Sequence, residues 1–435
     1  MLTAFARAFR TPDLRRKILF TLAIIALFRL GSVVPTPGVD ARAVNSCINT
    51  LDDSSIYGLI NLFSGGALLA LAIFALGIMP YITASIILQL LTVVIPRLEA
   101  LKKEGQSGTA RITQYTRYLT VGLAILQSAS IVAIAREPGR LFPGCPEDII
   151  PNDSMLVIVS MVVTMTAGTA VVMWLGELIT DRGVGNGMSL LIFTSIASGF
   201  PAQLGNILQS RGAYVFAGVI LMGLAIVAAV VFVEQAQRRI PVQYAKRMVG
   251  RRMYGGTSTY IPMKVNQAGV IPVIFASSLL YLPTLLAQIA GPDSTWGVWI
   301  DRYLVRGDHP IYMISYFLLI LFFTYFYVSI TFNPTDVADN MKKYGGFIPG
   351  IRAGRPTAEY LEYVLSRITL PGALYLATIA VIPLIALNIV SGPNNQGQNF
   401  VFGGTSILII VGVGLDTVKQ IESQLQQRNY EGFLR

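Results

Sequence analysis

The sequence predicts an all-α polytopic membrane protein with ten transmembrane helices, in two inverted five-helix halves with a re-entrant helix after the first span. Of the 435 residues, 53% are hydrophobic and 13% are charged, whereas about 25% are charged in ordinary soluble domains. Uncharged runs long enough to cross a bilayer recur along the whole chain. Lys and Arg are concentrated in alternate segments between these runs, which is typical of a membrane protein with a defined orientation.

Ten apolar runs define the expected spans, because each approaches the roughly 20 residues that a helix needs to cross a bilayer. In chain order they are residues 18–34, 74–95, 118–135, 155–176, 184–204, 213–233, 268–290, 311–332, 369–390 and 403–418. Basic residues precede the first run, which is too long for the apolar part of a signal peptide. We therefore expect the first span to insert and to remain.

The orientation follows from the loops. With the N-terminus in the cytosol, 26 of the 33 Lys and Arg residues lie in cytosolic segments and 6 in outer segments, and Arg29 lies within the first span. Cytosolic loops of membrane proteins are enriched in Lys and Arg, so both termini are expected in the cytosol. Omitting one span would exchange the sides of every later loop, so the asymmetry also supports the count of ten.

Residues 54–96 contain no charged residue. As one helix these 43 residues would reach roughly 65 Å, about twice the thickness of a hydrocarbon core. The orientation requires residues 56–71 to enter and leave on the same outer side, so we expect a short re-entrant helix followed by a full span. Gly65-Gly66 and the step 77–80 break the run, and non-helical backbone at membrane depth is tolerated where it lines a cavity. The alternative is a surface-lying amphipathic helix, but the segment has little polar face.

Five spans precede the short outer loop and five follow it. We therefore divide the chain into an N-terminal half, residues 1–205, an outer hinge loop, 206–212, and a C-terminal half, 213–435. Halves of opposite topology build a pathway at their interface in known transporters. The two halves share no convincing residue-level similarity, so the repeat is inferred from the count of spans.

The spans lack the chemistry of a pump or an enzyme. Arg29 is the one charge well inside a span, whereas secondary transporters keep ionisable residues at mid-depth. The sequence has no P-loop pattern and no spacing that selects a nucleophile and its base. His309 is the single histidine, so we expect neither a metal site nor a cofactor. A secondary transporter and a membrane-bound enzyme are therefore less favoured than a passive conduit driven by a partner. Cys47 and Cys145 are both placed outside, where a disulfide is possible, but the sequence favours two unrelated thiols.

Two long cytosolic segments, residues 234–267 and 333–368, carry many of the basic residues and several tyrosines. Positive-inside topology needs a few charges but not loops of this length, and long loops in compact proteins are usually functional. Basic surfaces with aromatic residues suit RNA phosphates or an acidic protein, so we expect docking here. Within the spans, Ile78 and Ile82 share a helix face, as do Met188 and Ile192. Such pairs occur in every membrane helix, although a ring of aliphatic residues can also gate a pore.

Several motifs in order resemble the SecY family, whose members are central subunits of bacterial protein-conducting channels. The matching segments are "ALGIMPYITASIILQLLTVV", "KKEGQSGTARITQYTRY", "DRGVGNGMSLLIF", "QRRIPVQYAKRMVGRR", "KVNQAGVIPVIFASS", "NPTDVADNMKKYGGFIPGIRAG" and "FGGTSILI". They run from the second span to the last. The resemblance implies a channel, not an enzyme, that translocates unfolded secretory polypeptides across the bacterial cytoplasmic membrane and releases membrane segments laterally.

The resemblance also implies site residues. A plug at about 56–71 would close the pore from outside, and its central residues are Asn61, Leu62, Phe63, Ser64, Gly65 and Gly66. The pore ring would consist of Ile78, Ile82, Met188, Ile192, Ile274 and Ile409. Met188 departs from the aliphatic residue expected there, but a thioether can still fill a gap. Signal sequences would open a lateral gate between the second and third spans and the seventh and eighth, at the polar positions Thr92, Gln127 and Asn266.

The partners implied by the resemblance are the SecE and SecG subunits, the SecA motor ATPase, the ribosome through its RNA, signal sequences with nascent chains, and membrane lipid. The two basic segments would bind the ribosome or SecA. Motif matching assigns this docking to Arg239 and Arg352, accompanied in the same segments by Arg247, Arg251 and Arg355.

Overall fold

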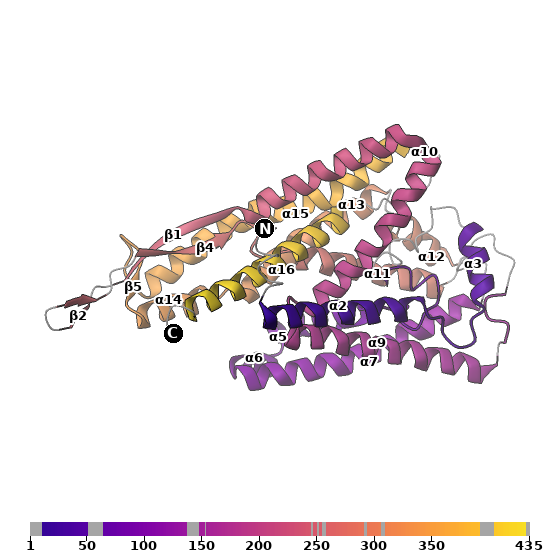
Figure 1. The fold of residues 1–435 in the computed structure, drawn as a ribbon, viewed down its shortest axis with the longest axis horizontal. Helices are drawn as coiled ribbons and strands as arrows, with labels where there is room; N and C mark the ends of the chain where they lie inside the picture. The colour runs from indigo at the N-terminus through magenta and orange to yellow at the C-terminus, as the bar shows by residue number, and fades with distance from the viewer. Residues whose placement is uncertain are drawn as a thin grey trace.

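The protein is an elongated helical molecule from which a small β-sheet projects at one end (Figure 1). The structure is a computed structural model. It describes residues 11–50, 64–136, 148–152, 154–244, 247–249, 252–254, 258–290, 294–305, 309–391 and 404–431.

The N-terminal half is built from helices. They are α2 (Pro12–Val33), α3 (Ala41–Thr50), α5 (Met79–Val94), α6 (Pro96–Lys103), α7 (Gln106–Ala135), α9 (Met155–Arg182) and the first part of α10 (Gly187–Gln235). The C-terminal half continues with α11 (Ile271–Ala290), α12 (Thr295–Ile300), the π-helix η1 (Asp301–Val305), α13 (Pro310–Thr331), α14 (Pro334–Lys343), α15 (Arg355–Ser391) and α16 (Gly404–Glu431). The strands are β1 (Gln237–Tyr244), β2 (Arg247–Val249), β3 (Arg252–Tyr254), β4 (Ser258–Lys264) and β5 (Gly346–Phe347).

Each of the ten expected spans falls on a helix of the structure or on part of one. By length and composition, five helices of the described residues are long and apolar enough to cross a membrane, or six if the bent pair α5 and α6 counts as one span. The remaining expected spans lie on helices that are shorter, interrupted or more charged. Two stretches of α10 and α11, for example, are apolar but short.

The sequence suggested a second span that begins at residue 74. In the structure its helix, α5, begins only at Met79. Residues 65–71 and 73–78 form turns on either side of a β-bridge from Ala72 to Pro35. Pro80 lies in the first turn of α5, where its missing N–H costs nothing because the first amides of a helix have no intrahelical acceptor. Gly77 has a φ of 54°, which is outside the helical region. Proline and glycine thus place the helix start here.

The expected hinge loop at residues 206–212 is helical instead. One helix, α10, covers both the fifth and the sixth spans, and its backbone is non-helical at Gly212 (φ 81°). The two arms of α10 meet there at a sharp bend (Figure 1). A single glycine can reverse the chain because it adopts positive φ without a Cβ clash.

A three-stranded antiparallel sheet in the order β4-β1-β5 joins the two basic segments. In the register Ile240 lies opposite Ile261, and Gln243 lies opposite Phe347. Ile240 and Val242 alternate with exposed residues along β1 and contribute to a buried cluster with α14 and α15. The sequence analysis treated both segments as separate loops, so this sheet is a finding of the structure.

Two further apolar clusters organise the membrane part. The larger one contains residues from both halves, and the smaller one joins the segment after α2, the turns before α5, and the ends of α7 and α9. Cys47 is buried in the smaller cluster and is disulfide-bonded. This corrects the expectation of two unrelated thiols; the other cysteine of the chain, Cys145, lies outside the described residues.

Candidate functional site

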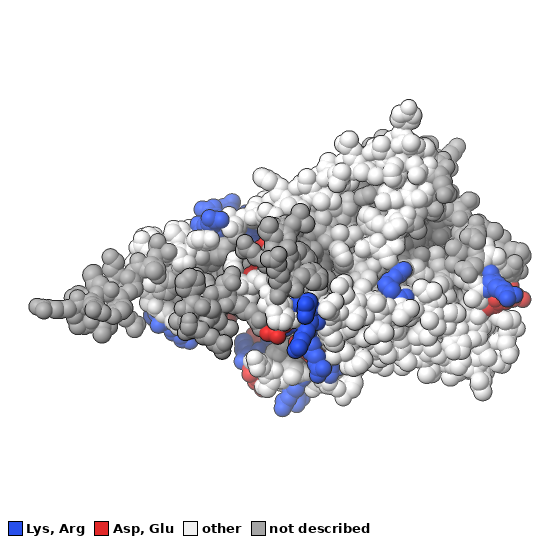
Figure 2. Space-filling view, in the orientation of Figure 1, with Lys and Arg blue, Asp and Glu red and all other residues white. Residues whose placement is uncertain are grey.

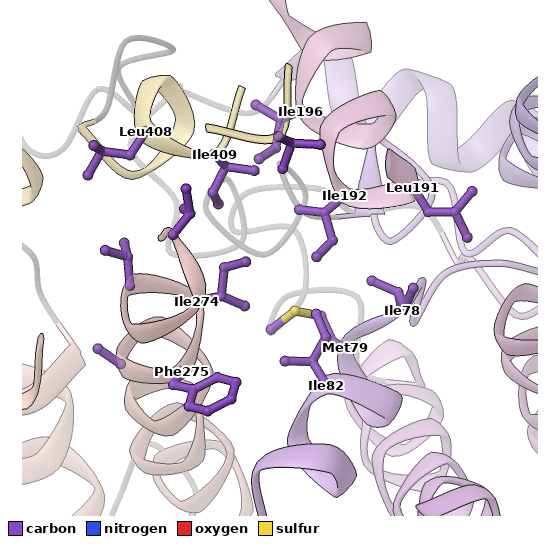
Figure 3. Packing of buried hydrophobic residues seen from close by; sticks show 14 of the residues in the cluster. Ile78, Met79, Ile82, Leu191, Ile192, Ile196, Ile274, Phe275, Leu408 and Ile409 are labelled. Carbon is purple, nitrogen blue, oxygen red and sulfur yellow. The ribbon is translucent and has the colours of Figure 1, made fainter. Parts of the chain in front are cut away.

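The expected pore ring comes together in the larger cluster. Ile78, Ile82, Ile192, Ile274 and Ile409 are buried members of this cluster, and Met188 is half-buried against it. They come from α5 and its start, α10, α11 and α16, so both halves contribute. Figure 3 shows the side chains of Ile82, Ile192, Ile274 and Ile409 directed toward one centre from four helices. Residues that are up to 331 positions apart in the sequence therefore lie in one apolar cluster.

Local structure positions these side chains. Ile78 precedes α5 and its carbonyl accepts a hydrogen bond from the amide of Ile82 (3.2 Å), so both residues lie on one face of the first turn. At the start of α10, Asn186 caps the helix by accepting from the amide of Met188 (3.1 Å). Asparagine is a preferred cap because its side-chain oxygen satisfies amides that lack an intrahelical partner.

Ile196 and Leu408 also belong to this cluster and were missed by the sequence analysis. Ile196 follows Ile192 by one helical turn, and both Ile196 and Leu408 are fully buried. Figure 3 places Ile196 beside Ile409, on the side of the cluster away from Ile82. The i, i+4 spacing from Ile192 was the signal available in the sequence.

The expected plug is described in part. Asn61, Leu62 and Phe63 lie outside the described residues, whereas Ser64–Gly66 are described. A guanidinium N–H of Arg29, in α2, donates to the carbonyl of Gly65 (Nη1 to O, 2.8 Å). Arg29, the one charge well inside an expected span, thus has a backbone carbonyl as its partner.

The turns that follow are joined by hydrogen bonds to Val34 and Thr36, which lie just after α2. Thr36 donates to the carbonyl of Leu71 from its amide (3.0 Å) and from Oγ1 (2.6 Å). The amide of Ile73 donates to the carbonyl of Val34 (2.9 Å). Leu71 has a φ of 43°, a conformation that costs a non-glycine residue about 1–3 kcal/mol. These bonds hold the strained turn.

The three expected gate residues are buried, but no hydrogen bond of the described chain joins two of them. Thr92 donates to the carbonyl of Gln89 in its own helix (2.7 Å), and Oε1 of Gln127 has no partner among the described residues. Asn266 donates from Nδ2 to the carboxylate of Glu234 and to the carbonyl of Gly269 (3.1 Å). Local sequence pattern gives no sign of this contact, because Glu234 and Asn266 are 32 positions apart.

The basic docking residues lie on the projecting sheet and the segment beside it. Arg239 of β1 is exposed, and its guanidinium lies over the ring of Tyr260 on β4, 4.8 Å from the centroid. Arg247 lies in β2, and Arg251 lies outside the described residues. In Figure 2 few charges appear over the wide body of the molecule; the largest group of Lys and Arg side chains lies near the middle, with smaller patches toward the sheet and at the opposite end.

Arg352 is exposed in a turn before α15. Its carbonyl accepts a hydrogen bond from Oγ1 of Thr357 (2.9 Å), which fixes the backbone and leaves the side chain outward. Arg355 instead pairs with Glu359 one helical turn later (3.1 Å). Arg352 is thus the better presented of the two for an external anion. Within the described residues, no group of three His, Cys, Asp or Glu side chains is placed to hold a metal ion.

Comparisons with known proteins agree on one family. The family model described as SecY matches residues 72–418. A protein translocase subunit SecY of Streptomyces scabiei is 68% identical over 442 residues, and one of Mycobacterium tuberculosis (strain ATCC 25618 / H37Rv) is 62% identical over 444 residues; both matches cover 100% of each chain.

Solved structures share the fold. One, described as the structure of a protein conducting channel, has a TM-score of 0.64 and 18% identity, and the match covers 94% of this chain and 91% of that chain. Sec61 in the canine ribosome-channel complex from the endoplasmic reticulum has a TM-score of 0.61 and 17% identity, with the same coverage.

Proposed function

The chain belongs to the SecY family, and from this membership we propose how its residues would conduct a polypeptide through the membrane. It is a protein translocase subunit with the fold of a protein-conducting channel. The chain passes unfolded secretory polypeptides across the membrane and releases membrane segments sideways into lipid. In this proposal the energy comes from a partner, since Arg29 is the one charge well inside an expected span.

The proposed pore ring is part of the larger apolar cluster. It consists of Ile78, Ile82, Met188, Ile192, Ile274 and Ile409. Its support is the convergence of buried aliphatic side chains from both halves on one centre. A narrow collar of such side chains excludes water, and ions cannot cross it because they would lose their hydration. Aliphatic side chains make no specific bonds to a passing chain, so the ring can fit around many sequences.

The proposed plug covers this ring from the outer side in the idle channel. Its described base, Ser64–Gly66, lies against α2 through the Arg29 hydrogen bond. The lateral gate lies between α5 with α7 and α11 with α13. Among the described residues, Asn266 bonds to Glu234 and Gly269 and no hydrogen bond joins two gate residues, so packing between these helices holds the proposed gate closed and a bound signal sequence can replace it.

The proposed docking surface is the sheet β4-β1-β5 with the turn before α15. It presents Arg239 and Arg352, and arginine binds phosphate and carboxylate groups through two parallel hydrogen bonds. The Sec61 structure is that of a ribosome-channel complex, which supports the ribosome as one partner. SecA, SecE and SecG complete the proposed assembly in the bacterial cytoplasmic membrane, with both termini in the cytosol.

Disulfide crosslinking tests the function most directly. Single cysteines at Ile82, Ile192 and Ile409, in a background without the two native cysteines, are paired with a stalled secretory chain that carries its own cysteine. We expect crosslinks at all three positions, because each side chain faces the centre of the ring. A cysteine at Leu221, on the exposed face of α10, is the control and should not crosslink. An engaged chain that crosslinks at none of the three would place the path elsewhere.

A further inference from the structure

We propose that Arg29 is a latch that holds the base of the plug in the closed channel. The proposal rests on the function given above and assigns a positioning role to a residue outside the ring, the gate and the docking surface. The central observation is the hydrogen bond from Nη1 of Arg29 to the carbonyl of Gly65 (2.8 Å).

The position of the charged residue Arg29 inside a membrane-spanning helix has to be explained. Arginine inside a transmembrane helix is costly, and such residues usually mark a functional contact. Arg29 is half-buried near the outer end of α2 and directs its guanidinium to a backbone carbonyl 36 positions later. A hydrogen bond from a charged donor is stronger than one between neutral groups, particularly where water is scarce. Moving Gly65 away would therefore leave the half-buried guanidinium of Arg29 without this hydrogen bond, which costs free energy.

The notch that receives Gly65 fits glycine closely. A Cβ at this residue would lie 2.9 Å from Nη1 of Arg29, 3.1 Å from Cα of Ser195 and 3.1 Å from Oγ of Ser198. Gly65 also has a φ of 66°, which disfavours any other residue. The plug base thus sits between α2 and α10 with Arg29 beside it, and any side chain at Gly65 would push against the latch.

The neighbouring contacts distinguish two parts of this segment. The turns from Leu71 onward are fixed, whereas the base at Gly65 can be released. From Leu71 onward the turns are held by backbone bonds to Val34 and Thr36, and Leu71 is fully buried. Gly66 follows Gly65 with a φ of 94° and has no atom within 4 Å of an added Cβ, so the chain has room there. Movement of the plug would break the Arg29 contact while the turn at Leu71 stays in place.

The test measures resting ion conductance of the assembled translocase complex in planar bilayers, without a substrate. Arg29→Gln removes the charged donor, and Gly65→Ala crowds the notch while leaving the charge of Arg29 intact. We expect each variant to raise the resting conductance, because loss of a charge-assisted bond shifts a two-state equilibrium about ten-fold or more. Arg42→Gln, an exposed arginine on α3, is the control and should behave as the wild type. Wild-type conductance of Arg29→Gln, in complex assembled at normal yield, would overturn the latch.

Deletion of residues 56–66 distinguishes the latch from the plug itself. If the latch acts through the plug, the deletion alone raises the conductance, and adding Arg29→Gln to it changes nothing further. An additional rise in the combined variant would mean that Arg29 acts elsewhere and would overturn the proposal. If the deletion raises the conductance and Arg29→Gln does not, the plug assignment stands and the latch proposal is wrong. If the deletion leaves the resting conductance unchanged, both the plug assignment and the latch proposal are wrong.

Discussion

Ile409 illustrates how one side chain can set the closed state. It is 0% exposed in α16 and lies in the apolar cluster that joins both halves. A polar side chain here would leave an amide without partners among aliphatic neighbours, which costs about 1–3 kcal/mol. The cost falls on the closed channel, because in the open channel the same position would face water or polypeptide.

We predict that Ile409→Asn loosens the closed state and lets secretory proteins with defective signal sequences cross. The expected gain in export of a signal-defective reporter is about ten-fold, which follows from a closed state weakened by roughly 1.4 kcal/mol. Leu221→Asn, on the exposed face of α10, tests whether any new polar residue has this effect. An unaltered signal requirement in Ile409→Asn would argue against its place in the ring.

Arg352 offers a second residue-level test. Its backbone is held by Thr357 and its side chain is exposed, so a charge reversal should leave the fold intact. We expect Arg352→Glu to abolish motor-driven translocation into membrane vesicles while the complex accumulates normally, because the acidic partner surface would now be repelled. Arg367→Glu, an exposed arginine on α15, is the matched control. Normal translocation by Arg352→Glu would refute its docking role.

At the scale of elements, the bend of α10 allows one helix to supply both the fifth and the sixth spans. The bend depends on Gly212, whose φ of 81° no other residue adopts without cost. Gly218 lies in the same helix, and an added Cβ would meet no atom within 4 Å at either position. The two glycines therefore differ in backbone conformation and not in available space.

This pair gives a controlled comparison of thermal stability. Gly212→Ala should lower the melting temperature of the purified complex, because a residue with a Cβ at positive φ costs about 1 kcal/mol or more. Gly218→Ala should raise it slightly or leave it unchanged, since alanine favours a helix by about 1 kcal/mol over glycine. Equal effects of the two substitutions would contradict the assignment of the bend to Gly212.

For the whole molecule, the charge distribution separates a conduit from a coupled transporter. Of the 33 Lys and Arg residues, 26 lie in segments assigned to the cytosol, and Arg29 is the one charge well inside an expected span. Ion-coupled transport needs ionisable groups at mid-depth. We therefore expect the reconstituted complex to translocate a secretory protein without accumulating a small solute along an imposed ion gradient. Accumulation of a small solute driven by the ion gradient would contradict the channel interpretation.

Much of the fold could be read from local patterns. Hydropathy located a helix for each of the ten spans, because a lipid-exposed backbone has to satisfy its own hydrogen bonds. The glycines and the proline between residues 65 and 80 marked the break before α5. The ring residues came from the family resemblance and not from spacing, since apolar i, i+4 pairs occur in every membrane helix. The structure adds that they share one cluster.

Other features depend on contacts between distant segments. The partner of Asn266 is Glu234, the disulfide involves Cys47, and one sheet joins two basic segments that the sequence analysis treated as separate. β5 has two residues, so alternation carries little signal for the strand that joins the second basic segment to the sheet. Each of these contacts needs a register or a helix rotation that local composition does not specify.

The sequence by itself determined the class of the molecule and its spans, because hydropathy acts on each segment separately along the chain; the orientation stays a prediction from loop charge. Only the tertiary structure decided that Gly65 meets Arg29, that α10 bends at Gly212, and that aliphatic side chains from four helices meet at one centre. The physical reason is that these contacts arise from packing between segments, and packing depends on shape in three dimensions.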